Sequence, residues 1–159
     1  MKMCNMDINE HAPAIAKAEI RVQAPLETVW RIQCDIDRWS EWNPDIQRSK
    51  LEGPLSTGSV FRWKSGGAAI VSTLREIEPM RKIAWTGKAI GIRAAHSWSF
   101  ERQGDSVAVV TRESFDGWLP HIFPRTLRKM LDRSLRTWLQ NLKRRAEIGD
   151  PSRSPPSAE

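Results

Sequence analysis

Residues 37–44, DRWSEWNP, place two tryptophans three positions apart between charged residues and end in Asn-Pro. Residues 38–42 are long enough for about one helical turn. Pro44 prevents the helix from continuing, because it has no N–H and biases Asn43 toward an extended conformation. Side chains at i and i+3 share one face of a turn, so Trp39 and Trp42 point the same way. The stretch therefore predicts a short helix that closes one end of an apolar interior.

The residues before this stretch predict a strand and then a first short helix. Residues 18–23, AEIRVQ, alternate apolar and polar side chains as a half-buried strand does. The segment APLETVWRIQCDI follows, and Pro25 and Glu27 are both favoured near the beginning of a helix. The apolar stripe of this helix consists of Val29, Ile32 and Ile36, with Trp30 beside it.

The chain after Asp45 predicts a series of antiparallel strands. Six strand-like segments alternate with connections that are rich in Gly, Pro, Ser and Asp. The segments are residues 46–52, 60–65, 69–77, 82–87, 94–102 and 107–115. Their close spacing and short turns are typical of an antiparallel meander.

The last part of the domain predicts one long amphipathic helix. After Pro124, apolar residues recur at helical spacing for about 25 residues, or roughly 40 Å, and Gly149 is a suitable stop. The apolar face carries Leu127, Met130, Leu131, Ser134, Leu135, Trp138, Leu139 and Leu142. We therefore expect an α+β fold in which a curved antiparallel sheet wraps around the C-terminal helix. The two short helices would close one end, and a cavity can remain between sheet and helix.

Length, composition and cysteine content restrict the class of protein. The 159 residues fit one domain, which we expect at residues 17–148, between a flexible leader at 1–16 and a disordered tail at 149–159. A signal-peptide pattern and an apolar run long enough to span a bilayer are both missing, which favours a cytoplasmic protein. Cys4 and Cys34 form neither a disulfide framework nor a metal motif, and the histidines are scattered, so we expect no metal and no cofactor.

Several motifs carry a resemblance to a known family. They are APLETVW, DIDRWSEWNP, GSVFRWKSGG, IVSTLREIEPMRKIAWTG and HSWSFE. Over residues 15–147 the chain resembles the polyketide cyclase/dehydrase branch of the START-like (SRPBCC) superfamily, which has the helix-grip fold. The resemblance implies a deep hydrophobic cavity. Members bind lipids, hormones, polyketides or protein partners, and some catalyse ring closure or dehydration.

The resemblance also bears on the two tryptophans of DRWSEWNP. It implies that Trp39 and Trp42 lie on the short second helix, near the mouth of the cavity. The alternative is that their rings only close the core beneath this helix. We favour the core for Trp42, and for Trp39 both interpretations stay open. The loop GWLPHIFP precedes the long helix, where the resemblance puts a cavity entrance, so Trp118 and His121 either gate a ligand or pack on the core.

Strand alternation predicts which side chains point inward. The inward set is apolar except for His96 and Glu113, which lie on adjacent predicted strands. One interpretation is a general acid/base pair in an apolar pocket, because His titrates near neutrality and burial raises the pKa of a Glu. The other is a buried pair with a structural role alone. The candidate ligand-binding residues are Trp39, Phe61, Trp63, Trp85, His96, Trp98, Thr111, Glu113, Phe115, Trp118, Leu131 and Trp138.

Three functions remain open from the sequence. The first is binding of a small hydrophobic molecule, such as a lipid, a polyketide-like compound or an aromatic, between sheet and last helix. The second is a cyclase or dehydratase that uses His96 and Glu113. The third is contact with a protein, or weak contact with an anionic membrane surface, through the basic face of the last helix. That face carries Arg125, Arg128, Lys129, Arg133, Arg136, Lys143, Arg144 and Arg145, in a chain with net charge +6. Nucleic acid is not favoured, because no nucleic-acid motif accompanies these charges. The oligomeric state is not predicted.

Overall fold

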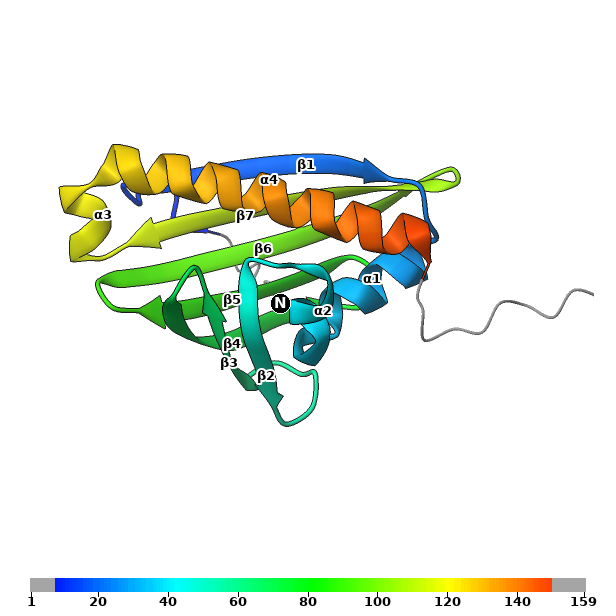
Figure 1. Cartoon of the computed structure of the whole chain (residues 1–159), viewed down its shortest axis with the longest axis horizontal. Helices are drawn as coiled ribbons and strands as arrows, with labels where there is room; N and C mark the ends of the chain where they lie inside the picture. Colours follow the sequence, from blue (N-terminus) through cyan, green and yellow to red (C-terminus); the bar gives the residue numbers. More distant parts are fainter. Residues whose placement is uncertain (1–7, 150–159) are drawn as a thin grey trace, which may run out of the picture.

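A computed structural model describes residues 8–149, whose strands form one seven-stranded antiparallel sheet (Figure 1). The strands are β1 (Ala14–Val22), β2 (Ile46–Glu52), β3 (Val60–Ser65), β4 (Ala68–Glu78), β5 (Lys82–Ala89), β6 (Ile92–Gln103) and β7 (Ser106–Asp116). The helices are α1 (Leu26–Cys34), the 3-10 turn η1 (Ile36–Arg38), α2 (Trp39–Trp42), α3 (Trp118–Ile122) and α4 (Pro124–Ile148). The expected α+β helix-grip arrangement is confirmed.

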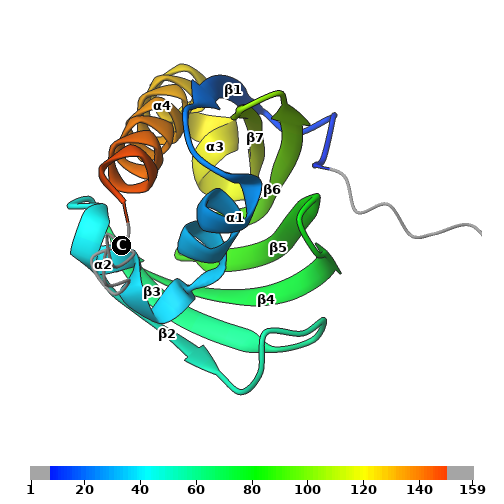
Figure 2. The same cartoon turned by 90° about the vertical axis from the view of Figure 1, so that its right-hand side faces the viewer.

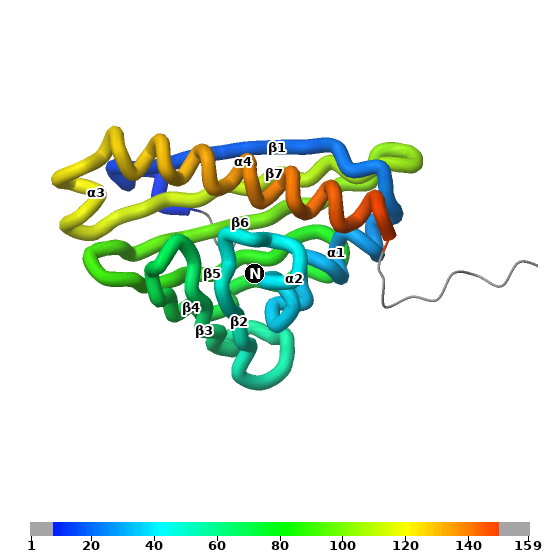
Figure 3. Tube along the Cα trace, in the orientation of Figure 1, coloured from blue at the N-terminus to red at the C-terminus, as the bar shows by residue number. Residues whose placement is uncertain are grey.

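The order of the strands follows from the meander. Strands β2 to β7 each pair with their neighbours in sequence and β1 adds to β7, which gives the order β1-β7-β6-β5-β4-β3-β2. The sheet curves from β1 round to β2, and α4 lies beside β1 (Figure 2). The trace in Figure 3 shows α3 at one end of the sheet and α1 at the other. The long helix therefore packs mainly on one edge of the concave face, against β1.

The first strand begins earlier than expected. β1 starts at Ala14, which pairs with Phe115, so residues 14–16 of the expected leader belong to the sheet. Their sequence, AIA, has no polar residue and so shows no alternation, although pairing with β7 makes it a strand. Residues 1–7 of the leader and residues 150–159 of the expected tail lie outside the described residues.

The two short helices at one end form as the sequence predicts. Pro25 caps α1, and its carbonyl oxygen accepts hydrogen bonds from the N–H groups of Thr28 and Val29. Helix α2 ends at Trp42 because Asn43 is extended, with φ −118° and ψ 101°, as expected for a residue before proline. The turn η1 joins the two helices, so the chain reverses over the end of the sheet and turns Trp39 toward the interior.

The sequence predicts a loop before the long helix, and the structure instead has the short helix α3 there. It is held at the far end of the sheet by a hydrogen bond from the N–H of Leu119 to the carbonyl oxygen of Gly91, at 3.2 Å. Two glycines permit this approach. A Cβ at Gly117, where φ is 113°, would lie 2.4 Å from Gly91 O, and a Cβ at Gly91 would lie 2.8 Å from the Trp118 ring. Trp118 therefore lies against the β5–β6 turn.

Candidate functional site

The concave face of the sheet is built from the side chains that strand alternation predicts. Register pairs His96 with Glu113, Trp98 with Thr111, and Trp85 with His96. These residues point into the space between sheet and α4. Most residues that were expected to point inward are buried. They are Phe61, Trp63, Ile83, Trp85, His96, Trp98, Phe100, Val107, Val109, Thr111 and Glu113. The assignment of these side chains to the interior is confirmed.

Trp39 lies at the centre of an aromatic cluster and has no exposed surface. Its ring centroid lies 5.0 Å from that of Trp138, 5.5 Å from those of Phe61 and Trp85, and 5.7 Å from that of Trp63. Its Nε1–H donates a hydrogen bond of 2.8 Å to the carbonyl oxygen of Gln33. Trp39 is thus part of the buried core, and its contact with a ligand stays a prediction. Trp42 is half-buried and packs against the same cluster, as favoured.

The aromatic cluster joins α1 and α4 as well as the sheet. The Nε1–H of Trp138 donates a hydrogen bond of 3.1 Å to Gln33 Oε1, and Gln33 is fully buried although it is polar. The same glutamine therefore binds one indole through its backbone and another through its side chain. This fixes the interior at the α1 end, where rings rather than open space occupy the concave face. The role of Gln33 has no signal in the sequence, because a polar residue on a short helix suggests an exposed position.

A polar chain crosses the apolar wall next to this cluster. The Thr111 hydroxyl donates a hydrogen bond of 3.1 Å to the carbonyl oxygen of Ser97, so its oxygen must accept the 2.8 Å hydrogen bond from His96 Nε2. The proton of neutral His96 therefore sits on Nε2. Its Nδ1 is then an acceptor that faces Glu113 Oε2 at 3.5 Å and has no hydrogen-bond partner among the described residues.

Burial sets the protonation state of this pair. Removal from water lowers the pKa of His96 from 6.5 to about 3, because the apolar surroundings disfavour the imidazolium. The same cause raises the pKa of Glu113 from 4.5 to about 8. Near pH 7 both groups are therefore neutral, and Glu113 is a hydrogen-bond donor. A neutral carboxylic acid beside an unprotonated ring nitrogen can give or take one proton, which is the chemistry of acid/base catalysis.

These two shifts predict how stability depends on pH. Between pH 3 and 6.5, His96 binds a proton in the unfolded chain but not in the folded protein. Its contribution to the free energy of unfolding therefore rises with pH over this range and is constant above pH 6.5. Glu113 keeps its proton in the fold but loses it in the unfolded chain between pH 4.5 and 8, so its contribution falls with pH there. Together they predict a plateau between pH 4.5 and 6.5 and a decline to pH 8. At about 1.4 kcal/mol per pH unit, the decline amounts to roughly 2 kcal/mol.

Urea unfolding followed by circular dichroism across this pH range measures the effect. Glu113→Gln removes the titrating carboxyl and should abolish the decline above pH 6.5. The matched control is Glu101→Gln on the exposed outer side of β6, which should leave the decline in place. A wild-type profile that is flat up to pH 8 would contradict the assignment of a neutral Glu113.

The concave face is less completely covered toward the α3 end. Several inward-facing apolar residues there are only half-buried, although residues of the same strands near α1 are fully buried. They are Ile70, Ala89, Ile92, Ala94 and Phe115. Ala94 pairs with Gly87 on one side and with Phe115 on the other. Two small residues, Gly87 and Ala94, therefore lie side by side in this part of the wall. The Glu113 side chain, one pair further along, keeps 11% of its surface exposed. The Glu113 side chain is therefore buried but not completely sealed from solvent.

The remaining candidate residues fall into two groups. Leu131 is buried against Ala16 and packs with Leu135 and Phe115 beneath the first half of α4. Trp118, in contrast, is 59% exposed and lies outside the concave face. His121 is also on the outside, where its Nδ1 donates to the carbonyl oxygen of Gly117. The small residues Gly87 and Ala94 were missed, although strand parity with Trp85 and His96 could have identified them.

Charged residues surround a separate hollow on the outer face of the sheet. It has a volume of about 560 Å³, and its lining includes the partly buried ion pair of Lys82 with Glu76, at 3.1 Å. Ala108 is part of its lining. Charged walls do not suit a hydrophobic ligand, so this hollow is not part of the candidate site. Residues 8–149 contain neither a cluster of metal-binding side chains nor a helix apolar and long enough to cross a bilayer.

Comparisons with known proteins agree with this fold. The family described as "Polyketide cyclase / dehydrase and lipid transport" matches residues 13–147. Among curated proteins no sequence match was found.

Similar solved structures share the fold at low sequence identity. A hypothetical protein from Helicobacter pylori superposes with a TM-score of 0.78 and 17% identity, over 86% of this chain and 90% of that one. The Zhui aromatase/cyclase from Streptomyces sp. R1128 has a TM-score of 0.72 and 18% identity, covering 84% and 93%. A START superfamily protein from Mycobacterium smegmatis has a TM-score of 0.71 and 19% identity, covering 84% and 97%.

Proposed function

Because the chain belongs to the polyketide cyclase/dehydrase and lipid transport family, we propose that it binds a small hydrophobic molecule between the concave face of its sheet and α4. The site is the incompletely covered part of that face, toward α3. The observation that supports this proposal is the row of half-buried inward residues, among them Ile92, Ala94 and Phe115, beside the partly exposed carboxyl of Glu113. An apolar wall with one oriented polar group is typical of ligand sites.

The polar group limits the chemistry of the ligand. With a pKa of about 8, Glu113 is protonated near neutral pH and presents an O–H donor within apolar surroundings. A ligand carbonyl, ether or hydroxyl oxygen would accept this hydrogen bond, whereas a ligand carboxylate would meet an acid that cannot neutralise it. The ligand is therefore an apolar or aromatic molecule that carries a neutral oxygen, as polyketide-like compounds do. Simple alkanes would gain only the apolar contact.

The substitution Ala94→Trp tests where the ligand binds. An indole at this half-buried inward position would occupy the space above Gly87 and Phe115, so ligand affinity should fall by at least about tenfold. A thermal-shift screen of aromatics, flavonoids, fatty acids and sterols first identifies a ligand, since saturation at about a hundred times Kd stabilises the fold by roughly 2.7 kcal/mol. The affinity of the variant is then measured by calorimetry.

The matched control is Ala108→Trp, which adds the same ring to the outer face of β7. It should bind the ligand as the wild type does. If Ala94→Trp also retains full affinity, the ligand does not bind on the concave face at this end. If no compound class shifts the melting temperature, the interior is a filled core and the binding proposal fails.

A second candidate function is catalysis of the cyclase or dehydratase type. The observation that favours it is the pairing of a partly exposed acid with a raised pKa and a neutral imidazole whose Nδ1 faces it at 3.5 Å. Such a pair can protonate a hydroxyl that leaves as water. As the C–O bond breaks, the carboxylate that remains takes a proton from the adjacent carbon, which is next to a carbonyl. The electron pair of that C–H bond forms the C=C bond, and the acid is restored. Ligand binding at the same place is required for both functions, and turnover distinguishes them.

A further inference from the structure

The end of the molecule that carries α3 exposes a group of large apolar side chains. Trp118 and Ile122 lie one helical turn apart on α3, and Phe123 follows this helix. Ile90 is at the tip of the β5–β6 turn, and Met130 is on the second turn of α4. We call this group the α3 patch; its members and exposed fractions are Ile90 (90%), Trp118 (59%), Ile122 (60%), Phe123 (53%) and Met130 (48%). The β5–β6 turn and α3 are in contact, because the Trp118 ring lies against Gly91, next to Ile90.

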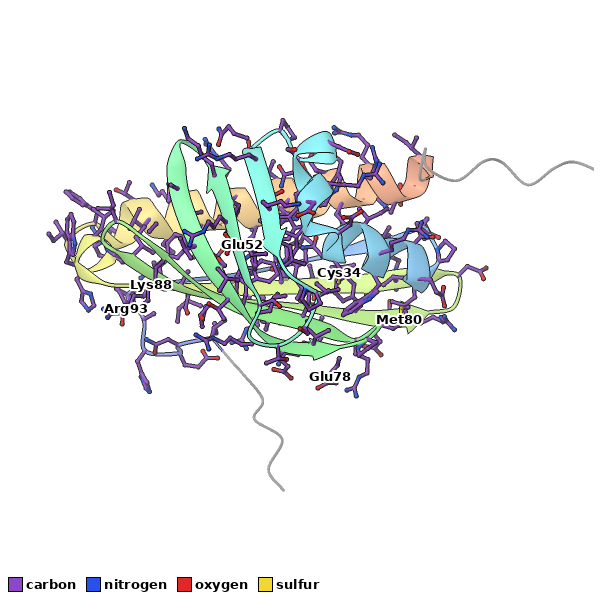
Figure 4. The ribbon with its side chains drawn as sticks, turned by 90° about the horizontal axis from the view of Figure 1, so that it is seen from below. Cys34, Glu52, Glu78, Met80, Lys88 and Arg93 are labelled. Atoms are coloured by element: carbon purple, nitrogen blue, oxygen red, sulfur yellow. The ribbon has the colours of Figure 1, made fainter. Side chains whose placement is uncertain are left out.

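The α3 patch is flanked by cations that have no acidic partner. Lys88, Arg125, Lys129 and Arg133 are exposed and make no ion pair within residues 8–149. Lys88 is the register partner of Arg93, and Figure 4 shows the two side chains at the end of the sheet that carries α3. Arg93, unlike Lys88, forms an ion pair with Asp116. The acidic side chains nearby, Asp116 and Asp132, are both engaged in ion pairs, the latter with Arg136.

Two of the three basic residues at the other end of α4 are in a different state. Lys143 pairs with Glu147, and Arg145 pairs with Glu41 of α2 at 3.3 Å. Their charge is therefore offset within the fold. The basic face expected from sequence to run along the whole helix is thus unpaired mainly in its first half, which borders the α3 patch. Five exposed apolar side chains and four cations without an ion pair among residues 8–149 therefore lie at the α3 end, whereas the C-terminal end of α4 carries one of each, Ile148 and Arg144.

We infer that the α3 patch docks on an anionic lipid bilayer, with the apolar side chains inserted at the interface and the flanking Lys and Arg bound to lipid phosphates. Trp and Phe beside Ile at the tips of short segments suit the boundary between headgroups and acyl chains. The unpaired cations suit a negatively charged leaflet. A neutral protein surface would satisfy the apolar residues but not the four unpaired cations. The inference does not depend on the proposed ligand.

Sedimentation with vesicles tests the inference on the full chain. The probes are vesicles of phosphatidylcholine alone and of phosphatidylcholine mixed with phosphatidylserine. The protein should bind the mixed vesicles, and binding should weaken as salt is raised, because salt screens the attraction between Lys or Arg and phosphate. The double variant Ile90→Ser/Ile122→Ser should lower the partition coefficient by at least about tenfold, since it removes two exposed apolar anchors.

Two double variants serve as matched controls. Leu55→Ser/Ile148→Ser removes exposed apolar side chains away from α3 and should bind as the wild type does. For charge, Arg125→Gln/Lys129→Gln should reduce binding and its salt dependence, whereas Arg48→Gln/Arg144→Gln, at exposed positions elsewhere, should have less effect. All of these positions are exposed, so folding should be unaffected, as circular dichroism can check.

Four results of the vesicle experiments would overturn the inference. These are no binding to the mixed vesicles, equal binding to pure phosphatidylcholine, equal loss in the patch variant and its apolar control, or full binding by Ile90→Ser/Ile122→Ser. Sedimentation velocity gives an independent readout. If the wild type self-associates and Ile90→Ser/Ile122→Ser does not, the α3 patch contacts a second copy of the chain, and the membrane assignment is wrong.

Discussion

The substitution Trp39→Ala is expected to lower the free energy of unfolding by about 3–5 kcal/mol, the range observed when a buried Trp or Phe is truncated. The Trp39 ring has no exposed surface and contacts four aromatic rings contributed by β3, β5 and α4. Those rings belong to rigid strands and a long helix, so they cannot collapse into the space left behind. The substitution also leaves the carbonyl oxygen of Gln33 without its donor. Urea unfolding, with the slope of the transition checked for constancy, measures the loss.

Two further tryptophan variants define what Trp39 contributes. Trp118→Ala removes a ring that is 59% exposed, so we expect a loss of only about 1 kcal/mol. Trp39→Phe keeps most of the apolar contact but removes the indole N–H, and we expect a loss between those of the two alanine variants. A cost for Trp39→Ala no greater than that for Trp118→Ala would show that the aromatic cluster is not the centre of the core.

The fold could be predicted from the sequence because its signals are local. Alternation in the strands, short turns between them and the helical spacing after Pro124 each depend on neighbouring residues, and the bounds of β2 and β3 agree with those expected. Asn-Pro determines the end of α2 in the same way. The helix α3 could not be predicted, because it depends on a hydrogen bond to Gly91 and on the absence of a side chain at Gly117. Neither contact has a local signature.

The candidate site was predictable only in part, for a related reason. Strand parity places His96 and Glu113 on the same face of adjacent strands, and the register confirms that they are directly opposite. The tautomer of His96 depends on the Thr111 hydroxyl, whose own donor bond goes to Ser97, so it follows only from three-dimensional geometry. Whether a buried Trp lines a space or fills it is likewise a matter of packing. Alternation shows that Trp85 and Trp98 point inward, but not that rings from α2 and α4 meet them.

Glu113→Gln is expected to abolish turnover if the chain is an enzyme of the cyclase or dehydratase type. Gln keeps the size and the hydrogen-bonding capacity of the neutral acid, but it can neither give nor take a proton. We therefore expect kcat to fall by at least about a hundredfold, the usual contribution of a general acid or base, while the ligand affinity is retained. The substrate is taken from the compounds that stabilise the fold, and turnover is followed by chromatography of the reaction products.

The pH dependence of the rate separates a catalytic role from a structural one. Since the protonated form of Glu113 starts the reaction and its pKa is about 8, the wild-type rate should fall as pH rises above that value. Any residual rate of Glu113→Gln should show no such fall. Glu101→Gln, at an exposed position on the outer side of β6, provides the matched control and should keep both the rate and its pH profile. Undiminished turnover in Glu113→Gln would exclude the acid/base role. It would leave the His96–Glu113 pair as a polar group that orients the ligand within an otherwise apolar wall.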